Sequence, residues 1–107
     1  MTAGAFDRNK RFSYELARVV ASKLVKDSSL LARGRGYLEL HVKTCPHQRR
    51  YYELWSTLLR LSPREIAARL LARNAEGELL RDTRPVFYVP TAVERAGAIA
   101  RARRPPD

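Results

Sequence analysis

A single cysteine between two histidines is the part of this chain best suited to metal or thiol chemistry. Cys45 lies between His41 and His47, and thiolate and imidazole are both good zinc ligands. The spacing is not that of a zinc finger, and no second Cys and His pair exists to complete a tetrahedral site. A thiol and its base also seldom come from neighbouring positions in a sequence. We therefore predict an ordinary loop here, with no metal.

The remaining residue types give no pattern for catalysis. Gly34 and Gly36 fit neither the dinucleotide-binding nor the phosphate-loop spacing. The carboxylates lie among arginines, where ion pairing explains them. A small enzyme would need a pocket that holds a perturbed acid or Cys45. We predict that the protein is not an enzyme and needs no cofactor.

Arginine dominates the charge of the chain. Seventeen arginines and four lysines face 11 acidic residues, and the net charge is +10. Such a charge steers a protein toward nucleic acid or another acidic surface. The alternative is a solvated surface, because Arg11 with Glu15, and Glu65 with Arg69, have the spacing of ion pairs on a helix. Arginine-rich and alanine-rich composition also arises in GC-rich genomes.

Three basic clusters remain once such local pairs are set aside. Tyr37, Tyr51 and Tyr52 lie near two of them in sequence, and arginine with interspersed aromatic residues suits RNA or a single strand. The tyrosines could equally lie at the edge of the core. The terminal arginines have no acid within helical reach except Asp107, beyond two prolines. The predicted nucleic-acid-binding residues are Arg33, Arg35, Lys43, Arg49, Arg50, Arg101, Arg103 and Arg104.

The leading functional prediction is a non-catalytic protein that binds RNA or DNA through arginine contacts to phosphate, as a small subunit of a nucleoprotein complex or alone. The alternative is a protein-interaction module, such as an antitoxin or inhibitor, that docks on an acidic protein. The choice depends on whether the basic clusters share one face.

Length and composition predict one domain outside the membrane. A chain of 107 residues with 45% hydrophobic residues can bury a modest single core. No apolar run is long enough to span a membrane, and the first ten residues lack the apolar stretch of a signal peptide. One cysteine cannot form an internal disulfide, which suits the cytoplasm. We expect a flexible segment at 1–10, a helical domain at 11–104 and a tail at 105–107.

Apolar periodicity predicts helices at 12–26, 29–43, 48–61, 63–73 and 92–103, with a shorter helical segment between 78 and 84. In the first helix the polar side chains fall opposite the apolar ones; these are Arg11, Glu15, Arg18 and Ser22. Gly34 and Gly36 would bend the second helix, break it or let a neighbour approach closely. Pro46 disfavours helix at Cys45. Trp55 is the expected centre of the core.

Local sequence signals set the ends of the later helices. Ser62 with Glu65, and Thr91 with Glu94, have the spacing of capping boxes. Residues 74–77 are expected to form a turn. Residues 86–89 are bounded by prolines and too isolated for a sheet, so an extended connector whose Phe87 plugs the bundle is expected. The predicted fold is an all-α bundle of about five helices.

Two partial resemblances concern function. Residues 61–70 resemble the first helix of a helix-turn-helix unit, but the segment that follows is short and acidic, which is unfavourable near phosphates. A second pattern is similar to a family of small helical bacterial accessory proteins, mostly uncharacterised, found beside toxin-like genes. It covers about two thirds of the chain and comprises Trp55, Leu58-Leu59, Leu79-Leu80-Arg81, Arg84-Pro85-Val86-Phe87, Glu94-Arg95 and Ile99.

The second resemblance implies a fold more than an activity, because its residues are mainly core and cap positions. Gly34 and Gly36 depart from it, since helices of the family are usually alanine-rich there.

Overall fold

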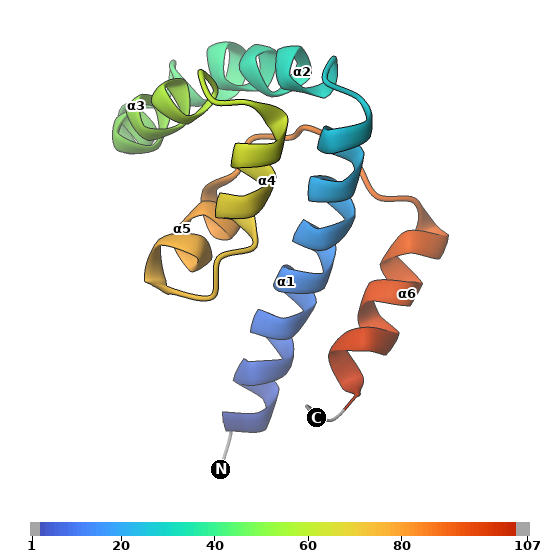
Figure 1. Ribbon diagram of the computed structural model, residues 1–107. Coiled ribbons are helices and arrows are strands. Elements are labelled where there is room, and N and C mark those ends of the chain that lie inside the picture. The colour runs from blue at the N-terminus through green and yellow to red at the C-terminus, as the bar shows by residue number, and fades with distance from the viewer. Residues whose placement is uncertain (1–2, 105–107) are drawn as a thin grey trace.

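The longest helix, α1 (Ala3–Lys26), is the element against which most of the others pack. The computed structural model describes the backbone of residues 3–104 and the side chains of residues 8–104. Helices α4 (Pro63–Leu70) and α5 (Ala75–Thr83) lie on one side of α1, and α6 (Ala92–Arg103) lies on the other (Figure 1). Three helical segments therefore flank one central helix.

Helix α1 begins earlier than its apolar pattern predicts. The apolar positions start at Phe12, and a helix was expected from residue 12, but residues 3–10 are also helical. The flexibility expected for residues 1–10 stays a prediction. Once a helix is formed, each residue added at its end gains one backbone hydrogen bond without a new nucleation step. The helix can therefore extend beyond the residues that bury an apolar face. Residues 1–2 and the tail expected at 105–107 lie outside the described residues.

Helices α2 (Leu30–Tyr37) and α3 (Arg49–Leu58) lie across one end of α1 (Figure 1). The two glycines of α2 neither break nor end it. The helix instead widens into a π-helical segment, η1 (Leu38–Val42), which replaces the last part of the helix predicted at 29–43. Cys45 is extended (φ −101°, ψ 110°), as expected before Pro46, and a short 3₁₀ turn, η2 (Pro46–Gln48), leads into α3.

The core centres on Trp55 and Phe87, as predicted. Both side chains are fully buried, and their rings meet edge to face with centroids 5.8 Å apart. The indole N–H donates to Thr83 Oγ1 at 3.0 Å, so the polar atom of the tryptophan is satisfied. Phe87 comes from the extended connector after α5, which crosses the end of α1 to reach α6 (Figure 1).

Both predicted capping boxes are present, and a third cap corrects the turn expected at 74–77. The Ser62 hydroxyl accepts from the Glu65 N–H, and the Thr91 hydroxyl accepts from the Glu94 N–H, with the reciprocal bonds in place. Asn74 starts α5 instead of a turn, because its Oδ1 accepts from the Gly77 N–H at 2.8 Å. Residues 71–74 are thus the whole connection between α4 and α5.

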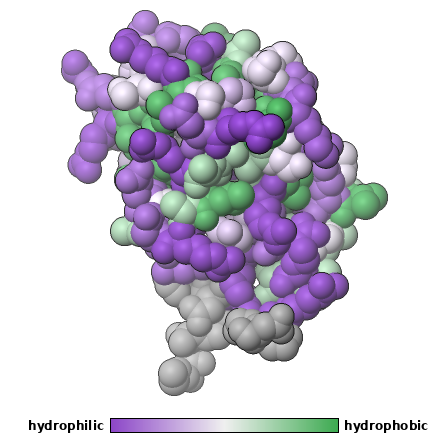
Figure 2. Space-filling model, in the orientation of Figure 1, coloured by the Kyte–Doolittle hydropathy of each residue, from purple (hydrophilic) through white to green (hydrophobic). Residues whose placement is uncertain are grey.

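The all-α fold class is confirmed. Across residues 3–104 the structure has six α-helices and no strand, and residues 86–89 are an extended connector. No helix of this part is long and apolar enough to cross a membrane. Hydrophilic side chains cover much of the face that Figure 1 presents, with smaller apolar areas between them (Figure 2).

The two glycines of α2 give the first prediction, because they differ only in their surroundings. A Cβ added at Gly34 would clash with the ring of buried Phe87, whereas one added at Gly36 would meet nothing within 4 Å. We expect Gly36→Ala to stabilise the fold by up to about 1 kcal/mol through helix propensity. Gly34→Ala should destabilise it by about 1–3 kcal/mol through overpacking.

Urea unfolding followed by Trp55 fluorescence measures both free energies. Equal effects of the two substitutions would show that Phe87 does not pack against α2.

Candidate nucleic-acid interface

The eight predicted binding residues do not share one face. Arg33, Arg35, Lys43, Arg49 and Arg50 belong to the α2–α3 end of the molecule, whereas residues 101–104 end α6 near the opposite end of α1 (Figure 1). A single ligand of modest size cannot contact both groups. The set must therefore be treated as two separate candidates.

At the α2–α3 end, most of the predicted cations have local partners. Arg35 Nη2 donates to the Leu59 carbonyl at 2.8 Å, close to the end of α3. Lys43 pairs with Glu39 at 3.3 Å, where the Tyr52 hydroxyl and Lys43 together lower the pKa of Glu39. In the same way, Arg49 pairs with Glu53 at 3.4 Å.

Arg33 and Arg50 make no ion pair within the described part of the chain, and both are exposed. The α2–α3 end thus has two dispersed arginines and several paired ones.

The terminal arginines have different surroundings from one another. Arg101 is not the unpaired cation that the sequence suggests, because its Nε lies 2.8 Å from Glu15 Oε1, on a helix far away in sequence. Arg103 lines a separate cleft of about 380 Å³ with Arg8, Phe12 and Ile99. Arg104 faces the same side of α1 as Arg101, and its carbonyl accepts from Arg11 Nη1 at 3.0 Å.

Three adjoining clefts lie along one face of α1, and we call them together the α1 groove. The largest, of about 770 Å³, lies beside residues 10–15 of α1, and two others of about 350 and 400 Å³ lie beside residues 18–26. Arg101 lines the first and second clefts, while Arg18, Ser22 and Lys26 line the second and third. The floor residues recur at helical spacing, so they form one stripe.

The walls of the α1 groove come from the flanking helices and their ends. Arg73 and Arg81 contribute from the α4–α5 side, while Arg101 and Arg104 contribute from the α6 side. At about 1.5 Å per residue, positions 10–26 of α1 make the floor about 24 Å long.

Positive charge collects in the α1 groove. Nine lining side chains are basic, against three acidic ones, Glu15, Glu78 and Glu94. The basic ones are Lys10, Arg11, Arg18, Lys23, Lys26, Arg73, Arg81, Arg101 and Arg104. Only Arg101 and Arg104 of these belong to the predicted set. The remaining seven come from three different segments, and the fold brings them together.

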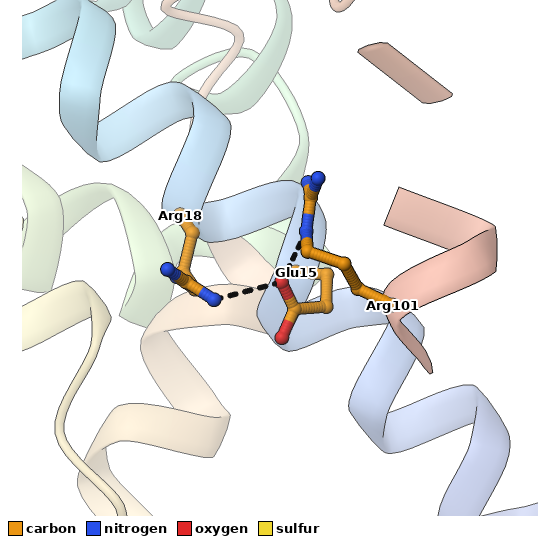
Figure 3. A network of polar contacts seen from close by, with 3 residues as sticks. All are labelled: Glu15, Arg18 and Arg101. Carbon is orange, nitrogen blue, oxygen red and sulfur yellow. Dashed lines mark hydrogen bonds and ion pairs between the residues drawn. The ribbon is translucent and has the colours of Figure 1, made fainter. Parts of the chain in front are cut away.

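Glu15, on the groove floor, orients Arg18 of the same helix and Arg101 of the α6 wall (Figure 3). Its Oε1 accepts from Arg18 Nη1 at 3.1 Å and from Arg101 Nε at 2.8 Å, and its side chain is only 14% exposed. The predicted partner of Glu15, Arg11, instead reaches the end of α6. One partly buried carboxylate therefore joins α1 to α6 and fixes two guanidinium groups at the centre of the groove.

A buried arginine supports the other wall. Arg81 is 8% exposed, and its Nη1 donates to the Leu70 and Ala72 carbonyls, both at 2.9 Å. These carbonyls lie at the C-terminal end of α4, where backbone acceptors lack partners within the helix. The same guanidinium lies 5.1 Å from the ring centroid of Tyr14. Arg81 thus connects α5 to α4 and to α1.

Arg73 lies over the same tyrosine. Its Cζ is 4.4 Å from the Tyr14 centroid, within the range of a cation–π contact, and the residue is exposed. The groove therefore contains an arginine whose charge faces solvent while an aromatic ring limits its movement.

Helix α6 is also held to α1 at its N-terminal end. The Thr91 N–H, the Tyr88 hydroxyl and Lys23 together lower the pKa of Glu94 to about 2. The hydrogen bond to Glu94 in turn raises the pKa of Tyr88. Lys23 Nζ of α1 lies 3.6 Å from Glu94 Oε2 of α6, so this ion pair holds the α6 wall of the groove against α1.

The metal and thiol candidates of the sequence do not converge on a site. Among residues 8–104, whose side chains the structure describes, no group of three His, Cys, Asp or Glu side chains is placed to hold a metal ion. His41 packs against Tyr37 with ring centroids 4.9 Å apart, and Cys45 is half buried in the loop before α3.

One signal could have pointed to the groove. The polar stripe of Arg11, Glu15, Arg18 and Ser22 is visible in the sequence, where it looks like a solvated face. Its flanking cations could not be foreseen, because Arg73 and Arg81 come near it only through packing of α4 and α5 against α1.

Comparison with protein-family models, curated proteins and solved structures finds no match to this chain. The resemblance to bacterial accessory proteins stays a prediction, and function must be argued from the groove itself.

Arg81 gives the second prediction. Arg81→Met keeps much of the side-chain volume but removes the donor to two carbonyls at the end of α4. Hydrogen bonds from charged groups contribute about 1.5–3 kcal/mol each, so we expect a loss of about 2–4 kcal/mol in the free energy of unfolding.

The control is Arg69→Met, which removes an exposed ion pair with Glu76 and should change stability by no more than about 0.5 kcal/mol. Urea unfolding of both variants gives the comparison. Similar small losses would show that Arg81 does not anchor α4.

The low pKa of Glu94 gives the third prediction. Its ordinary value is 4.5, and the folded value is about 2. Stability from a depressed carboxyl pKa is complete above pH 4.5 and is lost as the pH falls toward 2. We therefore expect the wild type to melt at a higher temperature than Glu94→Gln at pH 6.5, and this difference to shrink by pH 2.5.

Thermal unfolding of both proteins at the two pH values measures this. A difference that is constant or larger in acid would mean that Glu94 carries no stabilising charge.

Proposed function

We propose that this protein binds nucleic acid without catalysis, and that phosphate groups occupy the α1 groove. The observation that carries the proposal is the convergence of nine basic side chains from α1, the α4–α5 region and α6 on one groove. Scattered surface arginines would give no such local excess. Guanidinium groups match phosphate oxygens through paired N–H donors, which favours arginine wherever phosphate is bound.

The arrangement of the arginines favours an anionic ligand that is longer than a single phosphate. The floor of the groove extends about 24 Å, whereas the charges of one strand recur about every 3.4 Å along a duplex axis. Several successive phosphates can therefore contact the groove at once.

One buried donor of the groove also lacks an acceptor. Nε of Arg11 has no hydrogen-bond partner among the described residues, and Arg11 lines the largest of the three clefts of the groove.

The alternative is an acidic protein partner. It would also be attracted to the cations, because carboxylates pair with guanidinium groups through two oxygens as phosphates do. Its charges, however, are carried on flexible side chains whose ordering costs conformational entropy, whereas the phosphates of a polynucleotide belong to the backbone itself. Poly-glutamate is a direct probe of this alternative. The proposal expects it to compete for the groove more weakly than a polynucleotide of equal charge.

The fourth prediction compares two matched double variants. Arg18→Ala with Lys26→Ala removes two cations from the groove, and Arg33→Ala with Arg50→Ala removes two from the α2–α3 end. Both variants lower the net charge equally. We expect the groove variant to bind RNA or DNA at least about tenfold more weakly at low salt, with a salt slope reduced by about 1.4–1.8.

Fluorescence anisotropy between 50 and 200 mM salt measures affinity and slope. The α2–α3 variant should stay within about twofold of the wild type. Equal losses in both variants would place the binding outside the groove. An affinity that does not change with salt would overturn the proposed function itself.

A further inference from the structure

A stacking surface for a base restricts the form of nucleic acid that the α1 groove favours. The bases of a duplex are already paired and stacked on their neighbours, whereas the bases of a single strand are free to stack on a side chain. A groove that combines cations with such a surface therefore favours a single strand.

The groove cations differ in how far a ligand can reach them. Arg81 is buried and donates to two carbonyls, and Arg101 is held against Glu15. Arg18, Lys26, Arg73 and Arg104 are exposed, so phosphates can contact them. Helix α5 adds three exposed acids, of which Glu76 pairs with Arg69 and Glu78 with Lys10.

The sequence of α4 resembles the first helix of a helix-turn-helix unit, which would bind double-stranded DNA. The acidic surface of the next helix, α5, disfavours that mode of binding. The second helix of a helix-turn-helix unit must approach phosphates closely. Three exposed carboxylates on α5 make such an approach unfavourable.

Arg73 offers a stacking surface for a base. Its guanidinium carbon lies 4.4 Å from the centroid of the Tyr14 ring, and the residue is exposed, so a ligand can reach the group from solvent. Guanidinium planes stack on bases as aromatic rings do, and their charge contributes as well. Arg81, which also lies against Tyr14 and is anchored by two backbone carbonyls, keeps the ring in place.

We infer that the α1 groove holds a single nucleic-acid strand, with one base stacked on Arg73 against Tyr14. The inference rests on the proposed function, since it specifies the ligand of the same groove. The phosphates of the strand follow the basic side chains of α1 and α6, and the stacked base lies at the α4–α5 wall. Because every base has a π-face, such stacking tolerates any sequence.

The first experiment compares an unstructured 15-nucleotide strand with a blunt duplex of the same sequence, for both RNA and DNA, by fluorescence anisotropy. We expect the single strand to bind at least about tenfold more tightly than the duplex. Equal or tighter duplex binding would overturn this inference and leave the proposed function intact. If neither form binds, and inorganic polyphosphate does not bind either, the proposed function fails.

The second experiment separates stacking from charge with Arg73→Lys. Lysine keeps the positive charge but has no planar group to stack. We expect binding of the single strand to weaken by about 5- to 100-fold, while the salt slope and the affinity for polyphosphate, which has no bases, stay unchanged.

Arg50→Lys, at the α2–α3 end, is the matched control and should bind as the wild type does. Circular dichroism checks that each variant is folded. No loss in Arg73→Lys, or an equal loss for polyphosphate and the strand, would show that Arg73 acts by charge alone and would overturn the stacking claim.

Discussion

A buried arginine holds together the parts of the molecule that form the groove. Arg81 bonds two carbonyls at the end of α4 and lies against Tyr14 of α1 while being part of α5. Without it, the short connection between α4 and α5 would leave backbone acceptors unpaired next to the core. The charge of Arg81 therefore stabilises the fold. Its contact with Tyr14 also holds that ring at the groove wall, where Arg73 packs on it.

The high net charge is divided between structure and surface. Some arginines act as caps or helix connectors, as Arg35 does at Leu59 and Arg11 does at Arg104. Others are held in the groove by the few acids present, and Glu15 is the clearest case (Figure 3). A charge of +10 therefore overstates the surface available to an anion. What matters for binding is the number of cations that face one ligand at once.

Local signals in the sequence predicted the elements well. The capping boxes, the break before Pro46, and the burial of Trp55 and Phe87 depend on neighbouring residues or on one strong preference, and all are confirmed. The start of α5 was missed because Asn74 suits a turn as well as an N-cap. The sequence left three alternatives for the second helix: a bend, a break or the close approach of a neighbour. The close approach of the Phe87 ring to Gly34 could not be chosen among them, because it depends on where Phe87 packs.

The site was harder to predict than the fold. Sequence spacing reveals only the ion pairs between near neighbours along the chain, so it gives no partner for Arg101, although Glu15 lies beside that residue in space. The predicted cations divide between two ends of the molecule, and the groove draws seven of its nine basic residues from outside that set. Helix packing, which sequence spacing does not encode, decides which charges converge.

A titration of the arginine Nε–Hε resonances with an unstructured single strand tests most directly whether the α1 groove is where nucleic acid binds. We expect the signals of Arg18, Arg73 and Arg101 to shift together, while those of Arg33 and Arg50 stay in place. Shifts confined to Arg33 and Arg50, with no change in the groove, would contradict this expectation.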